Sequence, residues 1–121
     1  MVVCAIEDLI FSIKISTAAK QLGVPIYFER GRDDILPTIR EKRPSLVIFD
    51  LNSARLAPMA AIAAIKADAE LRNVKLLGYV SHVDSETIAA AKRAGADQVL
   101  ARSAFVDRLA EILTTSKPTT R

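Results

Sequence analysis

Carboxylate-bearing residues directly follow two of the chain's apolar runs. The stretch SLVIFDL ends four consecutive apolar residues on Asp50, and Glu7 and Asp8 follow the run MVVCAI. Carboxylates that converge repel one another unless a cation lies among them, and their oxygens suit Mg²⁺. An aspartate beside such an ion has the chemistry of a nucleophile toward a phosphoryl group. Glu7, Asp8 and Asp50 are therefore candidate Mg²⁺ ligands, and Asp50 is a candidate phosphoryl acceptor.

These carboxylates meet only if the strands that precede them lie side by side. Short apolar runs rich in Val, Ile, Leu and aromatic residues, without the alternation of a half-exposed strand, predict strands buried on both faces. The predicted strands are 2–6, 24–29, 46–50, 75–80 and 98–101.

Helical patterns separate the predicted strands, and capping residues, glycine and proline mark their ends. The first predicted helix spans 9–22 and ends before Gly23, and the second runs from a cap at Asp33 or Asp34 to the residue before Pro44. The third spans 58–69, the fourth runs from a cap at Asp84 or Ser85 to Gly95, and the fifth follows Ser103. Alternating strands and helices predict an α/β fold with right-handed βαβ units. At this length we expect the flavodoxin-like (βα)5 doubly wound fold, with a five-stranded parallel sheet of order 2-1-3-4-5.

Length and composition limit the class of protein. The 121 residues predict one domain, 1–113, followed by a flexible polar tail, 114–121. The start has no basic segment and no apolar run approaches the ~20 residues that span a bilayer, so neither a signal peptide nor membrane association is expected. A net charge of +3 without a clustered basic helix predicts no nucleic-acid binding. The single cysteine, Cys4, lies in an apolar run and fits a reducing, cytoplasmic setting.

The segment SLVIFDLNSARLAPMAAIAAIKADAELRNVKLLGYVSHVDSETIAAAKRAGADQVLAR combines an Asp-Leu after the third strand with Ala-Gly-Ala-Asp before the fifth. In this combination the sequence resembles the receiver domain of bacterial two-component response regulators (CheY-like), over Val2 to about Leu113. The resemblance implies that Asp50 is the phospho-accepting aspartate and that an acidic pair after the first strand holds Mg²⁺. Glu7 and Asp8 are the candidates, although spacing back from Gly23 places the pair at Ile6 and Glu7.

Several other positions depart from the family's pattern. The switch hydroxyl falls on Val80, with Ser81 beside it as a substitute, and the family's lysine falls on Arg102. Arginine keeps the charge but presents a broad fork instead of a compact ammonium. The switch aromatic falls on Val99, and the turn after Asp50 reads SARLAP instead of the usual Pro and Asp-Gly pattern. The resemblance is therefore to an atypical receiver, or pseudo-receiver, whose switch is degraded.

Each candidate residue also has a structural interpretation. Asp50 is equally consistent with a rim carboxylate that caps the following loop. Glu7 and Asp8 place negative charge at the start of the first helix, where the macrodipole favours it. Arg102 is expected to form a static ion pair with Asp50, and His82 is expected to be a surface loop residue.

The favoured function is a stand-alone, non-enzymatic signalling module that acts through protein–protein interaction. The resemblance implies that the partner, a histidine kinase or a downstream regulator, contacts the fourth helix, fifth strand and fifth helix, where homodimerisation would also occur. The alternative is a functional single-domain response regulator phosphorylated on Asp50 in a phosphorelay. A small flavodoxin-like enzyme or cofactor binder is a remote alternative, because the sequence contains neither a G-x-G-x-x-G motif nor a P-loop.

Overall fold

A parallel sheet forms the centre of the molecule, as the alternating pattern predicts. The computed structural model describes residues 1–30, 34–53, 56–82 and 84–115. Five strands pair in parallel in the order β2-β1-β3-β4-β5, which confirms the flavodoxin-like prediction. Their bounds are β1 Val2–Ala5, β2 Ile26–Glu29, β3 Leu46–Asp50, β4 Lys75–Val80 and β5 Gln98–Ala101.

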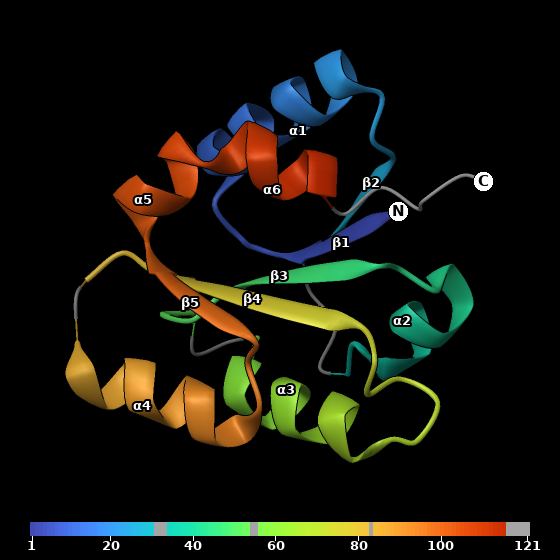
Figure 1. The fold of residues 1–121 in the computed structure, drawn as a ribbon, viewed down its shortest axis with the longest axis vertical. Helices are drawn as coiled ribbons and strands as arrows, with labels where there is room; N and C mark the ends of the chain where they lie inside the picture. The colour runs from blue at the N-terminus through green and yellow to red at the C-terminus, as the bar shows by residue number, and fades with distance from the viewer. Residues whose placement is uncertain (31–33, 54–55, 83, 116–121) are drawn as a thin grey trace.

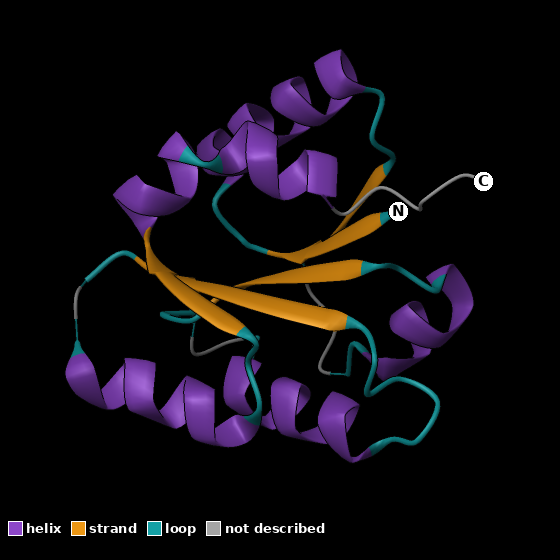
Figure 2. Ribbon diagram, in the orientation of Figure 1, coloured by secondary structure: helices purple, strands orange, loops and turns teal. Residues whose placement is uncertain are grey.

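Helices cover both faces of the sheet (Figure 1). The labels in Figure 1 place α1, α5 and α6 on one face and α2, α3 and α4 on the other, and Figure 2 shows the helices in purple on both sides of the orange strands. The apolar side chains form two separate cores, one on each side, which explains the lack of alternation in the strands. The helices are α1 Leu9–Leu22, α2 Leu36–Lys42, α3 Pro58–Ala67, α4 Ser85–Ala94, α5 Arg102–Asp107 and α6 Leu109–Thr115.

Capping residues fix the helices that frame the rim of the sheet. The carboxylate of Asp8 accepts the Phe11 N–H at the start of α1, and Asp84 accepts the Glu86 N–H at the start of α4. At the end of α1, Gly23 adopts a left-handed conformation with φ of 71°. Both N-caps complement the positive end of the helix dipole, so the acidic interpretation of the start of α1 is correct for Asp8.

Several predicted boundaries differ from the structure for identifiable reasons. The Val24 N–H donates to the Ala19 carbonyl at the end of α1, so β2 begins at Ile26 instead of 24. The start of α2 follows Ile35, and Asp34 accepts the Leu36 N–H from outside the helix. The other proposed cap, Asp33, lies outside the described residues. β1 ends at Ala5 and α3 at Ala67, one and two residues before the predicted ends of 6 and 69.

The predicted last helix is divided in two at Arg108. Arg108 has φ of −103° and ψ of 10°, and it separates α5 from α6. Its N–H donates to the Ala104 carbonyl, and its own carbonyl accepts from Ile112, so hydrogen bonding continues across the break. α6 includes the first two residues of the predicted tail, and 116–121 lie outside the described residues. No described helix is long and apolar enough to cross a membrane.

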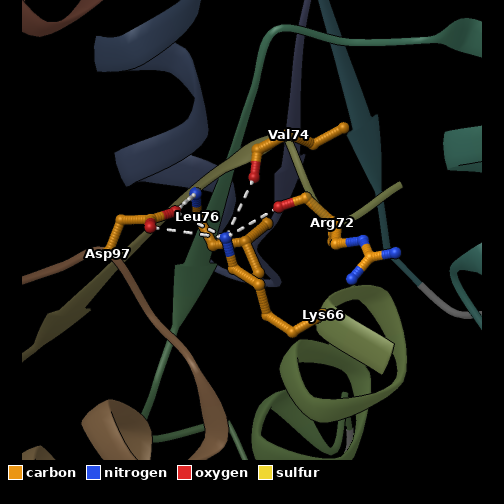
Figure 3. Close-up of polar contacts among 5 residues, drawn as sticks. All are labelled: Lys66, Arg72, Val74, Leu76 and Asp97. Atoms are coloured by element: carbon orange, nitrogen blue, oxygen red, sulfur yellow. Dashed lines mark hydrogen bonds and ion pairs between the residues drawn. The ribbon is translucent and has the colours of Figure 1, made fainter. Parts of the chain in front are cut away.

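Polar side chains connect the amino ends of β4 and β5 to the end of α3 (Figure 3). The Lys66 ammonium donates to the Arg72 carbonyl at 3.1 Å and pairs with Asp97 Oδ2 at 3.1 Å. The same Asp97 oxygen accepts the Leu76 N–H at 2.8 Å. Gly95 lies against the Lys66 side chain, and a Cβ added at Gly95 would be only 2.6 Å from Lys66 Cγ. We call Lys66, Asp97 and their backbone partners the amino-end latch.

Candidate functional site

Asp50 lies at the carboxyl end of β3, at the rim where ligands bind in open parallel sheets. It is half-buried and pairs in register with Tyr79 of β4. Burial raises the pKa of Asp50 above its usual value, and the charges of Asp8 and Glu7 act in the same direction. The hydrogen bond from Asn52 and the charge of Arg102 oppose this pKa increase. The side chain is therefore a partly desolvated carboxylate with two acidic neighbours.

Asn52 connects the loops that follow β3 and β4. Its N–H donates to Asp50 Oδ1 at 3.0 Å, and its side-chain Oδ1 accepts the Ser81 N–H at 2.7 Å. Asp50 thus caps the turn that follows it, as the structural interpretation of this residue predicts. Its role as a phosphoryl acceptor stays a prediction.

Glu7 and Asp8 are both engaged by protein groups. The Ser53 hydroxyl donates to the Glu7 carboxylate, and Asp8 accepts the Phe11 N–H at 3.0 Å. That backbone hydrogen bond is the main cause that lowers the pKa of Asp8, with Arg102 as a further cause. Among the described residues no three His, Cys, Asp or Glu side chains are grouped so as to hold a metal ion. Mg²⁺ binding by Glu7, Asp8 and Asp50 stays a prediction.

Arg102 pairs with Asp8, so the predicted ion pair with Asp50 is wrong. Its Nη2 lies 3.4 Å from Asp8 Oδ2, and its guanidinium carbon lies 4.1 Å from the centre of the Phe11 ring. Phe11 in turn packs against Tyr79 and Phe105 with ring centroids 5.0 and 5.8 Å away. The planar, weakly hydrated guanidinium suits an aromatic surface, and the acidic N-cap beside it supplies the counter-charge.

The position of the family's switch hydroxyl is part of the apolar core. Val80 is 1% exposed and packs in the core under α2, α3 and α4, whereas Tyr79, the register partner of Asp50, packs in the opposite core. Ser81 is exposed, and in the described contacts its N–H bonds to Asn52 while no hydrogen bond joins its hydroxyl to Asp50. Val99, at the position of the switch aromatic, packs half-buried against the same core as Val80.

Comparisons with known proteins identify the fold. No family model and no curated protein matches the sequence. Among solved structures, the signal receiver domain of a response regulator from Bermanella marisrubri aligns over 95% of both chains with a TM-score of 0.80 and 17% identity. A response regulator from Hahella chejuensis aligns over 99% of this chain and 96% of its own, with a TM-score of 0.78 and 13% identity. The receiver domain of NarL from Mycobacterium tuberculosis covers 98% and 96%, with a TM-score of 0.77 and 20% identity.

The chain has the fold of a response-regulator receiver domain. At these identities the similarity concerns the fold, so the roles of individual residues must be argued from their own contacts. In this fold Asp50 occupies the rim, Val80 ends the neighbouring strand β4, and Arg102 begins α5 directly after β5. Arg102 and Val80 are engaged with Asp8 and the core, respectively, instead of with Asp50.

Four residues that shape this rim were missed from the sequence. Asn52 and Ser53 bridge loops through contacts 29 and 46 residues away, to Ser81 and Glu7, and sequence position gives no sign of such pairs. Phe11 lies under the Arg102 guanidinium and packs against Tyr79. In the sequence these two residues indicate only apolar positions in a helix and a strand. The one sequence feature that indicates such a role is Asn52 itself, because asparagine side chains commonly form hydrogen bonds that stabilise turns.

Two surface features adjoin the rim. A groove of about 530 Å³ runs between the ends of β4 and β5 and is lined by Ser81, Arg102 and Asp107, among others. On the first turns of α1, Leu9, Ile10 and Ile13 are 62%, 81% and 65% exposed. Spacings of three and four residues place these apolar side chains on one side of the helix.

Proposed function

We propose that this chain is a receiver-like signalling module that acts through protein–protein interaction and whose phosphorylation switch is degraded. The observation that carries the proposal is the burial of Val80. A hydroxyl at this position would have to bind a phosphoryl oxygen on Asp50, but the residue is an apolar core side chain that has no hydroxyl to donate. A phosphoryl group on Asp50 would therefore find no hydroxyl at this position to pull β4 toward it.

The contacts of Arg102 support the same proposal. A cation that neutralises a phosphoryl group must be able to approach it, whereas Arg102 is paired with Asp8 and lies over Phe11. Both contacts would have to be lost before the guanidinium could turn to Asp50. The geometry thus favours a rim that remains in one state.

Protein interaction is supported by the exposed surface. The resemblance points to the face made by α4, β5 and the divided last helix, where Lys92, Arg93 and Arg108 are exposed, while Gln98 and Arg102 are half-buried. Arg102 and Arg108 are paired with Asp8 and Glu111, so the positive charge of this face comes from Lys92 and Arg93 at the end of α4. These two charges favour an acidic surface on a histidine kinase, a downstream regulator or a second copy of the chain. The apolar side chains of Leu9, Ile10 and Ile13 form an additional cluster of the kind found at interaction sites. The module is proposed to be non-enzymatic. A cytoplasmic location fits its single cysteine, Cys4, which is buried and has no second cysteine in the sequence to pair with.

Mg²⁺ is the cofactor that suits the acidic rim. The carboxylates of Glu7, Asp8 and Asp50 are of the right chemical type, and the solved response regulator Rcp1 has a Mn²⁺-bound form. A bound ion would neutralise the acidic rim. Ser53 and Phe11 already donate to Glu7 and Asp8, so the ion would have to compete with these hydrogen bonds.

A functional single-domain response regulator is the second candidate. The half-buried position of Asp50, with its raised pKa, favours it, because the carboxylate is at the rim and reachable. In that case Asp50 accepts a phosphoryl group in a phosphorelay, and Ser81 would have to turn its hydroxyl inward in place of Val80.

Intact-mass measurement after incubation with acetyl phosphate and Mg²⁺ separates the two candidates. The interaction module is expected to show the same mass before and after incubation, and so is Asp50→Asn. A phosphoryl adduct in the wild type that is absent from Asp50→Asn would overturn the proposal. A Mg²⁺ titration followed by NMR gives a second reading, since a flat titration contradicts the functional regulator.

A further inference from the structure

A cavity lies at the amino end of the sheet, opposite the rim that carries Asp50. It has a volume of about 270 Å³ and lies between α6 and the amino ends of β3, β4 and β5. Its apolar lining comes from Leu46, Leu77 and Ile112, which belong to the core on the α1 and α6 side of the sheet. α6 forms one wall, on the face that Figure 1 shows above the sheet.

Charged side chains surround this apolar lining. Lys75, Arg108 and Glu111 all contribute to the cavity. Arg108 Nε lies 3.2 Å from Glu111 Oε1, so these two charges offset each other. Lys75 is exposed and forms no ion pair with any residue in the described part of the chain. Ser45, Asn73, Gln98 and Thr115 complete the lining with polar groups. Among the described residues the cavity therefore combines an apolar patch, made by Leu46, Leu77 and Ile112, with one positive charge that has no counter-charge.

We propose that this cavity binds a small organic monoanion, a carboxylate attached to a compact apolar body. The apolar body would lie against Leu77 and Ile112, and the carboxylate would pair with Lys75. A volume slightly below the usual range of small-molecule sites restricts the ligand to a small one. An organic cation would meet Lys75 and Arg108, and a neutral molecule would leave the charge of Lys75 unused.

The proposal is independent of phosphorylation, because no residue of the cavity belongs to the rim around Asp50. The ligand would contact α6, the second of the two helices that replace the single predicted last helix. A ligand held between α6 and three strands would stabilise this region of the folded state, by mass action alone. At ten times its Kd it would lower the unfolding equilibrium constant about elevenfold.

The test uses four probes that separate charge from apolar surface. ¹H–¹⁵N spectra of the full chain are recorded with benzoate, benzyl alcohol, acetate and benzylammonium, each at millimolar concentration. Benzoate is expected to shift the amides of Lys75, Leu77, Gln98 and Ile112 in a saturable manner. The other three are expected to bind at least about fivefold more weakly, because each lacks the negative charge or the apolar body.

A matched pair of lysine variants locates the charge. Lys75→Gln is expected to weaken benzoate about fivefold, the upper range for an exposed ion pair. Lys92→Gln, an exposed lysine on α4 outside the cavity, is expected to leave the Kd unchanged. The native dispersion of each variant's spectrum verifies that it is folded.

Three outcomes would overturn the proposal. They are benzoate shifts that do not saturate or that map elsewhere, benzyl alcohol binding as tightly as benzoate, and equal losses in Lys75→Gln and Lys92→Gln. None of them bears on the acetyl phosphate experiment, so failure here and failure of the proposed function are distinguishable.

Discussion

The two ends of the sheet hold their charged residues in different ways. At the amino end, Lys66 and Asp97 share one set of hydrogen bonds with each other and with the backbone of β4 and the preceding loop. At the carboxyl end, Glu7 and Asp50 each accept a hydrogen bond from a different loop residue, and Asp8 pairs with Arg102. One end is an interconnected network, and the other is a row of carboxylates with separate partners.

The difference separates polar residues that support the fold from a carboxylate whose charge opposes folding. Asp97 satisfies a backbone N–H of a buried strand residue, so its loss leaves a donor without a partner. Burial raises the pKa of Asp50, so the negative charge of this side chain opposes folding instead of favouring it. A carboxylate at the rim of a sheet with its pKa raised in this way is a candidate for function.

The largest effect is expected from Asp97→Ala. This substitution leaves the Leu76 N–H without its acceptor and removes the counter-charge of Lys66, which keeps the Arg72 carbonyl. We expect the free energy of unfolding to fall by about 2 kcal/mol. Urea denaturation measures the change. Asp107→Ala, at an exposed position on α5, is the control and should change the value by less than about 0.5 kcal/mol. Equal losses in the two variants would contradict the latch.

Gly95→Ala is expected to lower the free energy of unfolding by about 1.5 kcal/mol. Gly95 has φ of 120°, and a Cβ would displace the Lys66 side chain from 2.6 Å away. Gly23→Ala is the matched control, because Gly23 also has a positive φ of 71° but nothing within 4 Å of its Cβ. Thermal unfolding should show the smaller loss for Gly23→Ala, and the reverse order would mean that contact with Lys66 does not matter.

Arg102→Gln should reduce the free energy of unfolding by about 1 kcal/mol, through loss of the Phe11 and Asp8 contacts. It should also raise the pKa of Asp50 further, because Arg102 is one of the groups that lower it. A ¹³C-detected pH titration of the carboxyl groups measures the pKa. An unchanged Asp50 pKa would show that the guanidinium exerts no field at the rim.

The smallest effect is expected for Asp50→Asn, which should stabilise the protein by less than about 1 kcal/mol at pH 7 because water screens the half-exposed carboxylate. The folded pKa of Asp50 is raised above the ordinary 3.8, so ionisation above that folded pKa opposes folding. As pH falls below 3.8 both states are protonated, and the advantage of the variant disappears. Urea denaturation at pH 7 and pH 3 tests this sign, and a destabilised variant at pH 7 would contradict it.

Much of the fold followed from local signals in the sequence. The buried strands, the Asp8 and Asp84 caps and the glycines that end α1 and α4 all act within a few residues, so the pattern reveals them. The break at Arg108 was not predicted, because 105, 109, 112 and 113 keep a helical spacing across it. The predicted start of β2 was wrong because the Val24 N–H donates to the Ala19 carbonyl at the end of α1. The apolar side chain of Val24 gives no sign of this backbone hydrogen bond.

The rim was predicted in position but not in its pairing. Strand ends placed Glu7, Asp8 and Asp50 together, whereas the partner of Arg102 depended on where Phe11 and the α1 cap direct the guanidinium. The links from Ser53 to Glu7 and from Asn52 to Ser81 join residues distant in sequence. Such contacts depend on how loops fold over a completed sheet, so a linear pattern does not contain them.

The most direct test of the central claim is the response of the α4–β5 surface to a phosphoryl mimic at Asp50. ¹H–¹⁵N spectra of the wild type and of Asp50→Asn are compared with and without beryllofluoride and Mg²⁺. With the hydroxyl position buried as Val80 and Arg102 engaged by Asp8, we expect the amides of Gln98–Ala101 and Ser85–Ala94 to keep their shifts. Shift changes that spread across these two elements in the wild type, and that vanish in Asp50→Asn, would contradict a degraded switch.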